Sequence, residues 1–311
     1  MGMRDEVIVN TDDKIFVSEL VKKLKEKTVC EVKVQKITKN NNMVLTGLCI
    51  MQKDCNIAPT IYLEYYKELY EDGSMDMEEI VDHIIQRDQE HRTNSMDVSF
   101  FTDFEKVKKD LSFKVINAER NIKLLEKVPH KRFLDLAKVY YVTVSNEAIG
   151  EGSIQINNNH MQMWGITEEE LDRIASAMGE ENQKACFIDM VSMIEEILQD
   201  KEEDSLEMIK DIEGIEPIMY VATNRKRFLG AAVMIYKTFL EQVAEKLKNN
   251  LIIFPSSVHE ILIVAESPAI DIYHCKKMVK DVNATQVEPD EFLSDNVYYY
   301  DRKTKELMIA D

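Results

Sequence analysis

The sequence predicts an α+β protein in which antiparallel β-hairpins alternate with amphipathic helices. Three observations predict this class. The apolar strand patterns occur in pairs joined by turn residues, without the regular strand–helix rhythm of a doubly wound sheet. Other apolar residues recur at three- and four-residue steps, the period of a helix with one buried face. Hydrophobic residues make up 45% of the 311 residues, which is enough for a sizeable core.

The first part of the chain predicts a helix, a hairpin and two more helical segments. Phe16, Leu20 and Leu24 share a helix face. The patterns EVKVQKI at 31 to 37 and MVLTGLCIM at 43 to 51 read as strands, and the three asparagines between them tolerate left-handed turns. TIYLEYYKELY follows Ala58-Pro59, and residues 76 to 91 form another amphipathic helix.

The longest apolar stripe predicts a helix that begins at Thr102, where Thr102 and Glu105 match a capping box. Its members are Phe104, Val107, Leu111, Val115, Ala118, Ile122 and Leu125. Segments 133 to 144 and 152 to 164 read as strands. A second capping box, Thr167 with Glu170, starts a helix that Gly179 is expected to end.

The last third predicts a strand at 218 to 222, a turn rich in Arg and Lys, a second apolar segment at 231 to 236, and a helix around Phe239. Strands at 251 to 254 and 258 to 265 follow, with a corner at 255 to 257. A helix at 272 to 282 precedes a final hairpin of 297 to 300 with 306 to 309. This order echoes the first third, so two related modules are one expectation.

Charge is uneven along the chain and suggests a domain boundary. The 57 acidic and 39 basic residues give 57 minus 39, or 18 negative units. Residues 195 to 216 contain ten acids against Lys201 and Lys210, a net of 8 negative, and so cannot be core. The expected organisation is an N-terminal α+β domain at 1–198, an acidic linker or helix end at 199–216, and a C-terminal α+β domain at 217–311.

Several function classes find no support. No apolar run reaches the roughly 18 residues of a membrane span and no signal peptide is seen, so a cytoplasmic protein is expected. The five cysteines are scattered without C-x-x-C spacing, and His83 and His91 do not share a helix face. With only 9 Gly, a Gly-rich phosphate cradle is absent. No metal and no cofactor is therefore expected.

The densest group of catalytic residue types is the corner of Ser256, Ser257, His259 and Glu260. Ser257 and His259 would lie on the same side of a strand, where a hydroxyl and a base could meet. The alternative is a corner whose hydroxyls satisfy backbone groups after Pro255. If a polar pocket exists here, it is expected to include 293 to 296. The candidate binding residues are Asn224, Ser256, Ser294, Asp295 and His160.

The charge balance also constrains nucleic-acid binding. The compact basic clusters are few, at 106 to 109, 131 to 132 and 225 to 227. Because neutralised phosphates supply most of the affinity for a duplex, a net charge of 18 negative disfavours direct duplex binding. An acidic protein could instead imitate DNA and occupy a nucleic-acid-binding protein.

Several strings resemble an uncharacterised domain-of-unknown-function family of anaerobic Gram-positive bacteria. They are APTIYLE at 58 to 64, DVSFFTDFEKVK at 97 to 108, PHKRFLDLAKVYY at 129 to 141, NNNHMQMWGITEEEL at 157 to 171, TNRKRFLGAAVMIY at 223 to 236, PSSVHEILIV at 255 to 264 and NATQVEPDEFLSDNVYYYD at 283 to 301. The resemblance implies a bacterial cytoplasmic protein of accessory or mobile DNA, and no activity, cofactor or substrate. A Ser usually precedes the family's histidine that matches His160, whereas Asn159 stands here.

The resulting hypothesis is a non-catalytic protein that acts by binding a macromolecular partner, most simply another protein. One alternative is a metal-independent hydrolase-like enzyme that uses Ser257, His259 and Glu260. The other is an acidic DNA mimic. The partner, the oligomeric state and any small ligand stay open at this point.

Overall fold

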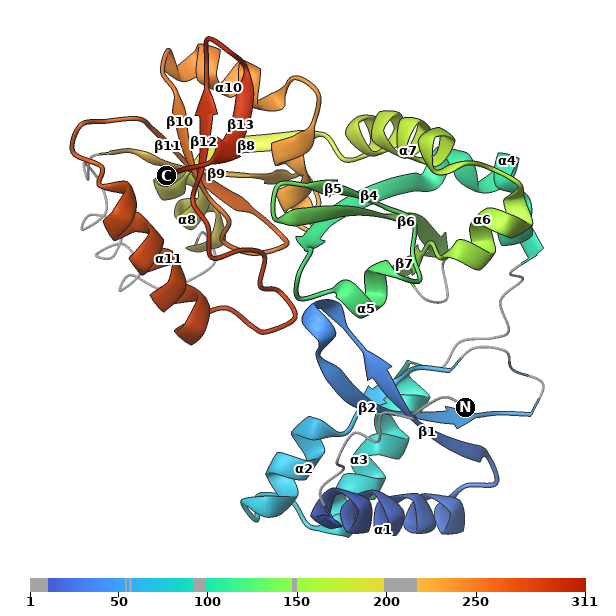
Figure 1. Cartoon of the computed structure of the whole chain (residues 1–311). Coiled ribbons are helices and arrows are strands. Elements are labelled where there is room, and N and C mark those ends of the chain that lie inside the picture. The colour runs from blue at the N-terminus through green and yellow to red at the C-terminus, as the bar shows by residue number, and fades with distance from the viewer. Residues whose placement is uncertain (1–10, 54, 56–57, 92–98, 147–149, 199–216) are drawn as a thin grey trace, which may run out of the picture. The chain divides into compact units, whose positions relative to one another are not determined.

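A computed structural model describes residues 11–53, 55, 58–91, 99–146, 150–198 and 217–311. The chain forms two compact units (Figure 1). The first unit comprises residues 1–39, 43–98 and 145–151, and the second comprises 40–42, 99–144 and 152–311.

The structure corrects the expected domain boundary at 199–216. Strand β8 (Ala185–Asp189) pairs with β9 (Met219–Asn224), so one sheet contains residues from both sides of that segment. This pairing excludes a boundary between separate domains at that point, because strands from both sides belong to one hydrogen-bonded sheet. Residues 199–216 themselves lie outside the described residues.

The first unit packs three helices against a small antiparallel sheet of strand order β1-β2-β3. Its elements are α1 (Thr11–Lys27), β1 (Glu31–Thr38), β2 (Val44–Met51), β3 (Ile61–Tyr62), α2 (Glu64–Glu71) and α3 (Met77–Glu90). The buried side chains of Phe16, Leu20 and Leu24 meet those of the sheet, so the predicted apolar face of α1 is confirmed. The expected hairpin is also confirmed, since Asn41 and Asn42 in the turn η1 (Asn40–Asn42) have φ of 58° and 57°.

The second unit contains two antiparallel sheets. The larger has six strands in the order β13-β12-β10-β11-β9-β8, and the smaller joins β4, β6 and β5, with β7 also paired to β6. The remaining strands are β4 (Leu111–Asn117), β5 (His130–Phe133), β6 (Leu136–Asn146), β7 (Gly150–Gln155), β10 (Leu251–Phe254), β11 (Ile261–Ala265), β12 (Tyr298–Asp301) and β13 (Glu306–Ile309).

Helices cover the faces of both sheets (Figure 1). Helix α7 (Glu168–Asn182) lies along the smaller sheet, and α5 (Ile122–Leu125) packs on its opposite face. Helix α11 (Ile272–Thr285) covers one face of the larger sheet. The short helix η4 (Gly230–Ile235), together with α10 (Phe239–Leu247), fills the main core that both sheets share. Shorter helices complete the unit: η2 (Ser99–Thr102), α4 (Phe104–Val107), η3 (Lys108–Asp110), α6 (Asn158–Trp164) and α8 (Met190–Leu198).

The long helix predicted from Thr102 to Leu125 is wrong. Only α4 and α5 are helical there, Asp103 rather than Thr102 caps α4, and β4 occupies the centre. The apolar positions fit two periods at once, because Leu111 and Val115 are also separated by an even number of residues. Both faces of β4 are buried, with Val115 in the main core and Ile116 in the core under α5. Ile122, expected in the core, is 53% exposed.

The apolar segment predicted at 231 to 236 forms most of η4, and Tyr236 follows directly after its end. Two smaller expectations fail. Residues 158 to 164 form α6 after β7, capped by Asn157. Gly179 lies inside α7, where an added Cβ would come within 3.0 Å of the Phe113 ring. That glycine serves close packing between helix and strand rather than helix termination.

The α+β class with antiparallel hairpins is confirmed. The idea of two related modules is not carried by the topology, because the last third of the chain shares its sheet with β8 and its core with the smaller sheet. Within the described residues, no helix has the length and apolar character needed to cross a membrane.

Candidate functional site

A buried lysine lies on the smaller sheet of the second unit. Lys138 is near the start of β6, opposite Val115 of β4, and is 8% exposed. Side chains alternate along a strand, so Lys138 and Tyr140 share a face. A buried ammonium is costly unless a carboxylate and further hydrogen bonds compensate it. The surroundings of Lys138 supply both.

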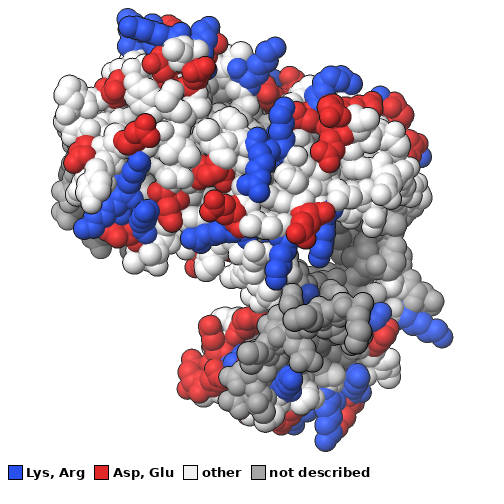
Figure 2. Space-filling model, viewed as in Figure 1, with Lys and Arg blue, Asp and Glu red and all other residues white. Residues whose placement is uncertain are grey.

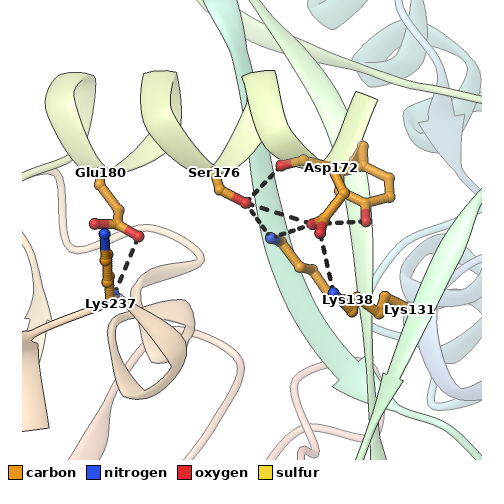
Figure 3. A network of polar contacts seen from close by, with 7 residues as sticks. Lys131, Lys138, Asp172, Ser176, Glu180 and Lys237 are labelled. Atoms are coloured by element: carbon orange, nitrogen blue, oxygen red, sulfur yellow. Dashed lines mark hydrogen bonds and ion pairs between the residues drawn. The ribbon is translucent and has the colours of Figure 1, made fainter. Parts of the chain in front are cut away.

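The partners of Lys138 come from α7 (Figure 3). The Nζ of Lys138 donates to Oδ1 of Asp172 at 2.5 Å and to Oγ of Ser176 at 2.6 Å. The hydroxyl of Tyr140 donates to the same Asp172 oxygen at 3.0 Å, and Nζ of Lys131 lies 3.3 Å from Oδ2. The Lys138 ammonium also lies 4.1 Å from the centroid of the Phe113 ring.

The local sequence explains why α7 presents these groups. Thr167 is the N-cap residue at the predicted position, where its hydroxyl accepts a hydrogen bond from the backbone N–H of Glu170. Asp172 and Ser176 are one turn apart and therefore lie on the same side of the helix. Gly179 allows α7 to approach Phe113 of β4 closely. The close approach brings a short aspartate within reach of a lysine on the sheet.

The environment shifts the ionisation of this network. Burial lowers the pKa of Lys138, and the hydrogen bond and charge of Asp172 oppose that effect. Burial acts against ionised Asp172, but its hydrogen bonds and the charge of Lys138 outweigh burial, and the pKa of Asp172 is lowered. Burial and the Asp172 charge raise the pKa of Tyr140, so its hydroxyl stays protonated as a donor. The pair acts as a fixed, ionised unit.

A pocket of about 480 Å³ opens beside this network, between β5 and β6 on one side and η4, α10, β12 and β13 on the other. Its cationic lining consists of Lys131, Arg132, Lys138, Lys237 and Lys305. Its two carboxylates, Asp172 and Glu241, are both in ion pairs with lining lysines. Five cations minus two anions leave a net lining charge of 3 positive.

The rest of the pocket lining is aromatic and aliphatic. It consists of Phe133, Met234, Ile235, Tyr236, Leu240, Tyr300 and Leu307. Arg132 and Lys237 are exposed and form no ion pair with a described residue. An apolar surface bordered by free cations fits a group that carries both an anionic and an apolar part.

The corner predicted from sequence lines a separate pocket of about 360 Å³. Ser256, Ser257, His259 and Glu260 border it, together with Arg227, Gln286, Val287 and Glu291. The Ser257 hydroxyl donates to Oε1 of Glu260 at 2.8 Å and accepts the backbone N–H of His259 at 2.9 Å. The structure thus brings the predicted residues together.

The imidazole of His259 is directed away from a catalytic arrangement with Ser257. Its Nδ1 accepts the backbone N–H of Leu229 at 3.1 Å, and its Nε2 lies 3.4 Å from Oε1 of Glu291. A general base must be within hydrogen-bond reach of the proton it removes. Both imidazole nitrogens of His259 therefore have partners other than the hydroxyl of Ser257.

The other candidate residues have structural partners. Residues 293 to 296 do not line the corner pocket. The hydroxyl of Ser294 donates to Asp135 at 2.6 Å, and Asp295 accepts from Asn283. Asn224 is fully buried and binds backbone groups of the turn that follows it.

His160 is packed rather than free. It accepts the backbone N–H of Asn157 at the start of α6, and its ring lies 4.9 Å from that of Phe101. Burial lowers the pKa of this imidazole. Its contacts explain its position without a ligand.

Sequence reasoning missed Lys138 and Asp172. A signal existed, because Lys138 is a single charge inside the apolar run LAKVYYV, which was predicted to be a strand. A lysine there must either reach solvent or find a buried partner. The partner could not be identified, since Asp172 is one of many acids in the sequence.

These features define an α+β protein whose second unit contains a cation-lined pocket over a buried lysine–aspartate pair. The chain matches the model of the family described as "Family of unknown function (DUF5688)" over residues 14–302, and it belongs to that family. No curated protein and no solved structure matches the chain. Among the described residues, no group of three or more His, Cys, Asp or Glu side chains could hold a metal ion.

Proposed function

We propose that this chain acts by binding a protein partner without transforming it, and that an acidic group of the partner occupies the pocket beside Lys138. The observation that carries the proposal is the positive charge of the pocket lining in an acidic protein. The chain has a net charge of 18 negative, yet this pocket has a net lining of 3 positive. Charge complementarity of this kind steers and orients an anionic partner.

The composition of the lining supports binding rather than catalysis. None of the described residues that line the pocket is Ser, Thr, Cys or His, the residue types that most often serve as nucleophiles or bases in hydrolases. The amine of Lys138 is engaged by Asp172 and Ser176, which makes it a fixed charge. Lys237 and Arg132 are free to pair with an incoming carboxylate or phosphate group.

The aromatic and aliphatic residues of the lining further restrict which chemical groups the pocket can bind. Phe133, Tyr236 and Tyr300 offer flat apolar surface next to the cations. Aromatic and arginine side chains are the residue types that dominate binding energies at protein interfaces. The bound segment is therefore expected to combine an acidic side chain with a neighbouring apolar one.

Capture of partners from a native-host lysate tests this proposal when wild type is compared with Lys237→Glu. The reversal places a negative charge in the pocket and should reduce partner recovery by about tenfold, which corresponds to roughly 1.4 kcal/mol. Lys303→Glu is the matched control, because Lys303 is an exposed lysine of the same unit outside the pocket. Equal recovery by Lys237→Glu and wild type, or equal loss in both variants, would contradict the proposal.

A hydrolase function is the alternative that the corner pocket favours, through the contact between Ser257 and Glu260. In that case Glu260, rather than His259, would have to take the proton of Ser257. A Ser257→Ala variant separates the two functions, since only the hydrolase requires this hydroxyl.

The DNA-mimic alternative would require a continuous acidic face. Figure 2 shows Lys and Arg side chains interspersed with Asp and Glu over the visible face of the second unit. This mixture gives the alternative no support on that face. Competition with duplex DNA for a captured partner would test it.

A further inference from the structure

The first unit has a strand with one unpaired edge. Within the described residues, β1 pairs with β2 and with no strand on its other side. The pairing runs without a bulge from Glu31 opposite Met51 to Thr38 opposite Val44. Edge strands expose unpaired N–H and C=O groups, which natural proteins often protect with short strands, charged side chains, prolines or bulges. β1 has eight residues, no proline and no bulge, and its protection consists of charged side chains, so a segment of complementary charge can add to its edge.

A groove of about 480 Å³ lies beside this edge. Its walls come from the exposed side of α1 and from β1 with its neighbour β2. The lining consists of Asp13, Lys14, Val17, Ser18, Val21, Val32, Val34, Lys36 and Thr46. Four valines make the groove largely apolar, and Val34 is 38% exposed. An uncovered valine beside an open strand edge leaves both apolar contacts and backbone hydrogen bonds available.

The alternation of β1 orients a bound strand. Val32, Val34 and Lys36 line the groove, whereas Lys33 belongs to the opposite face of the strand. A peptide that adds to the edge would place every second side chain beside the groove. Main-chain hydrogen bonds then supply general affinity, and the groove selects the side chains.

The charges of the groove indicate which peptide fits. Lys14 and Lys36 line it, and the carboxylate of Asp13 is engaged in an ion pair with Lys67. The remaining lining charge is therefore positive. Only an extended backbone matches the hydrogen-bond spacing of a strand edge, so a helix or a compact small molecule would leave those groups unpaired.

We infer that the edge of β1 and its groove bind an extended segment of a protein partner whose groove-facing side chains are β-branched and apolar beside Val32 and Val34 and acidic beside Lys36. The segment adds a strand to the sheet of the first unit. This site is independent of the pocket beside Lys138, because it is built entirely from residues of the other compact unit.

The test uses the full chain and a blocked synthetic hexapeptide, Val-Thr-Val-Thr-Glu-Thr, carrying a fluorophore. Its two valines and its glutamate share the face that meets the groove. Fluorescence anisotropy measures its affinity, and hydrogen exchange measures protection of the β1 amides. Lys36→Glu should weaken binding by about tenfold or more, because it places like charge beside the peptide. Lys33→Glu is the matched control, since it makes the same charge change on the other face of the same strand, and it should change affinity by less than about threefold.

The inference also predicts slower exchange of β1 amides when the peptide is bound. It is overturned if the peptide does not bind, if both lysine reversals weaken binding equally, or if binding leaves exchange in β1 unchanged. Sedimentation of the chain without peptide tests whether a second copy of the chain binds to the edge of β1 instead. Self-association that Lys36→Glu abolishes would show that a second copy, rather than a partner peptide, adds to the edge.

Discussion

The pocket beside Lys138 and the corner at Ser257 both contain polar side chains, but they are assembled differently. Asp172 and Lys138 are 34 residues apart in the chain and meet only in the folded unit. Ser257, His259 and Glu260 are sequence neighbours that mainly satisfy one another and the backbone. Catalytic residue types that are adjacent in the sequence can simply form a hydrogen-bonded turn, as at Ser257. Charged residues that are distant in the sequence but meet in the fold, as at Lys138, line a cavity.

The largest expected effect separates the two members of the buried pair. Asp172→Ala leaves the ammonium of Lys138 without its carboxylate and should destabilise the chain by about 3 to 5 kcal/mol. Lys138→Met leaves Asp172 with Lys131 and the Tyr140 hydroxyl as partners, so it should cost less, about 1 kcal/mol. Urea denaturation of both variants measures the difference. Equal destabilisation would show that the carboxylate does not compensate a buried charge.

The dependence of stability on acidic pH gives a second test of the buried pair of Asp172 and Lys138. The pKa of Asp172 is lowered on folding, so its contribution to stability is complete above the ordinary value of 3.8 and disappears as pH falls through the folded value. The stability advantage of wild type over Asp172→Asn should therefore be constant near neutrality and shrink below pH 3.8. Denaturation curves at stepped pH test this. An advantage that persists unchanged at the lowest folded pH would argue against an ionised Asp172.

The smallest effects are expected at the corner. Ser257→Ala removes two hydrogen bonds of a buried hydroxyl, and should cost about 1 to 2 kcal/mol while leaving partner recovery unchanged. Glu260→Gln, which keeps an acceptor for Ser257, serves as the conservative control and should cost less. Loss of partner recovery or of a measured turnover in Ser257→Ala would reverse the ranking of the two pockets.

The sequence predicted the fold class and most strands, because hairpins depend on local alternation and turn residues. The three asparagines and the final hairpin are examples that the structure confirms. The longest helix that was predicted is wrong for a local reason. β4 is buried on both faces, so its apolar residues follow no single period, and the pattern across Leu111 and Val115 fits a strand as well as a helix.

Of the two pockets, only the one whose residues are adjacent in the sequence could be predicted. The corner at Ser257 was found, because its residues are adjacent in the chain. The pocket beside Lys138 depends on α7, β6, α10 and β13 meeting in space, which a spacing pattern does not encode. The one local sign was the isolated lysine inside an apolar strand. Its physical meaning emerges only when Asp172 is placed beside it.

Side-chain NMR of the full chain, labelled with ¹⁵N at lysine and histidine, tests the central claim most directly. The captured partner, or an acidic fragment of it, is added in increments. The pocket predicts shifts at the Nζ resonances of Lys138 and Lys237, with the ring nitrogens of His259 unchanged. Shifts at His259 without any change at Lys138 and Lys237 would contradict the account and place binding at the corner instead.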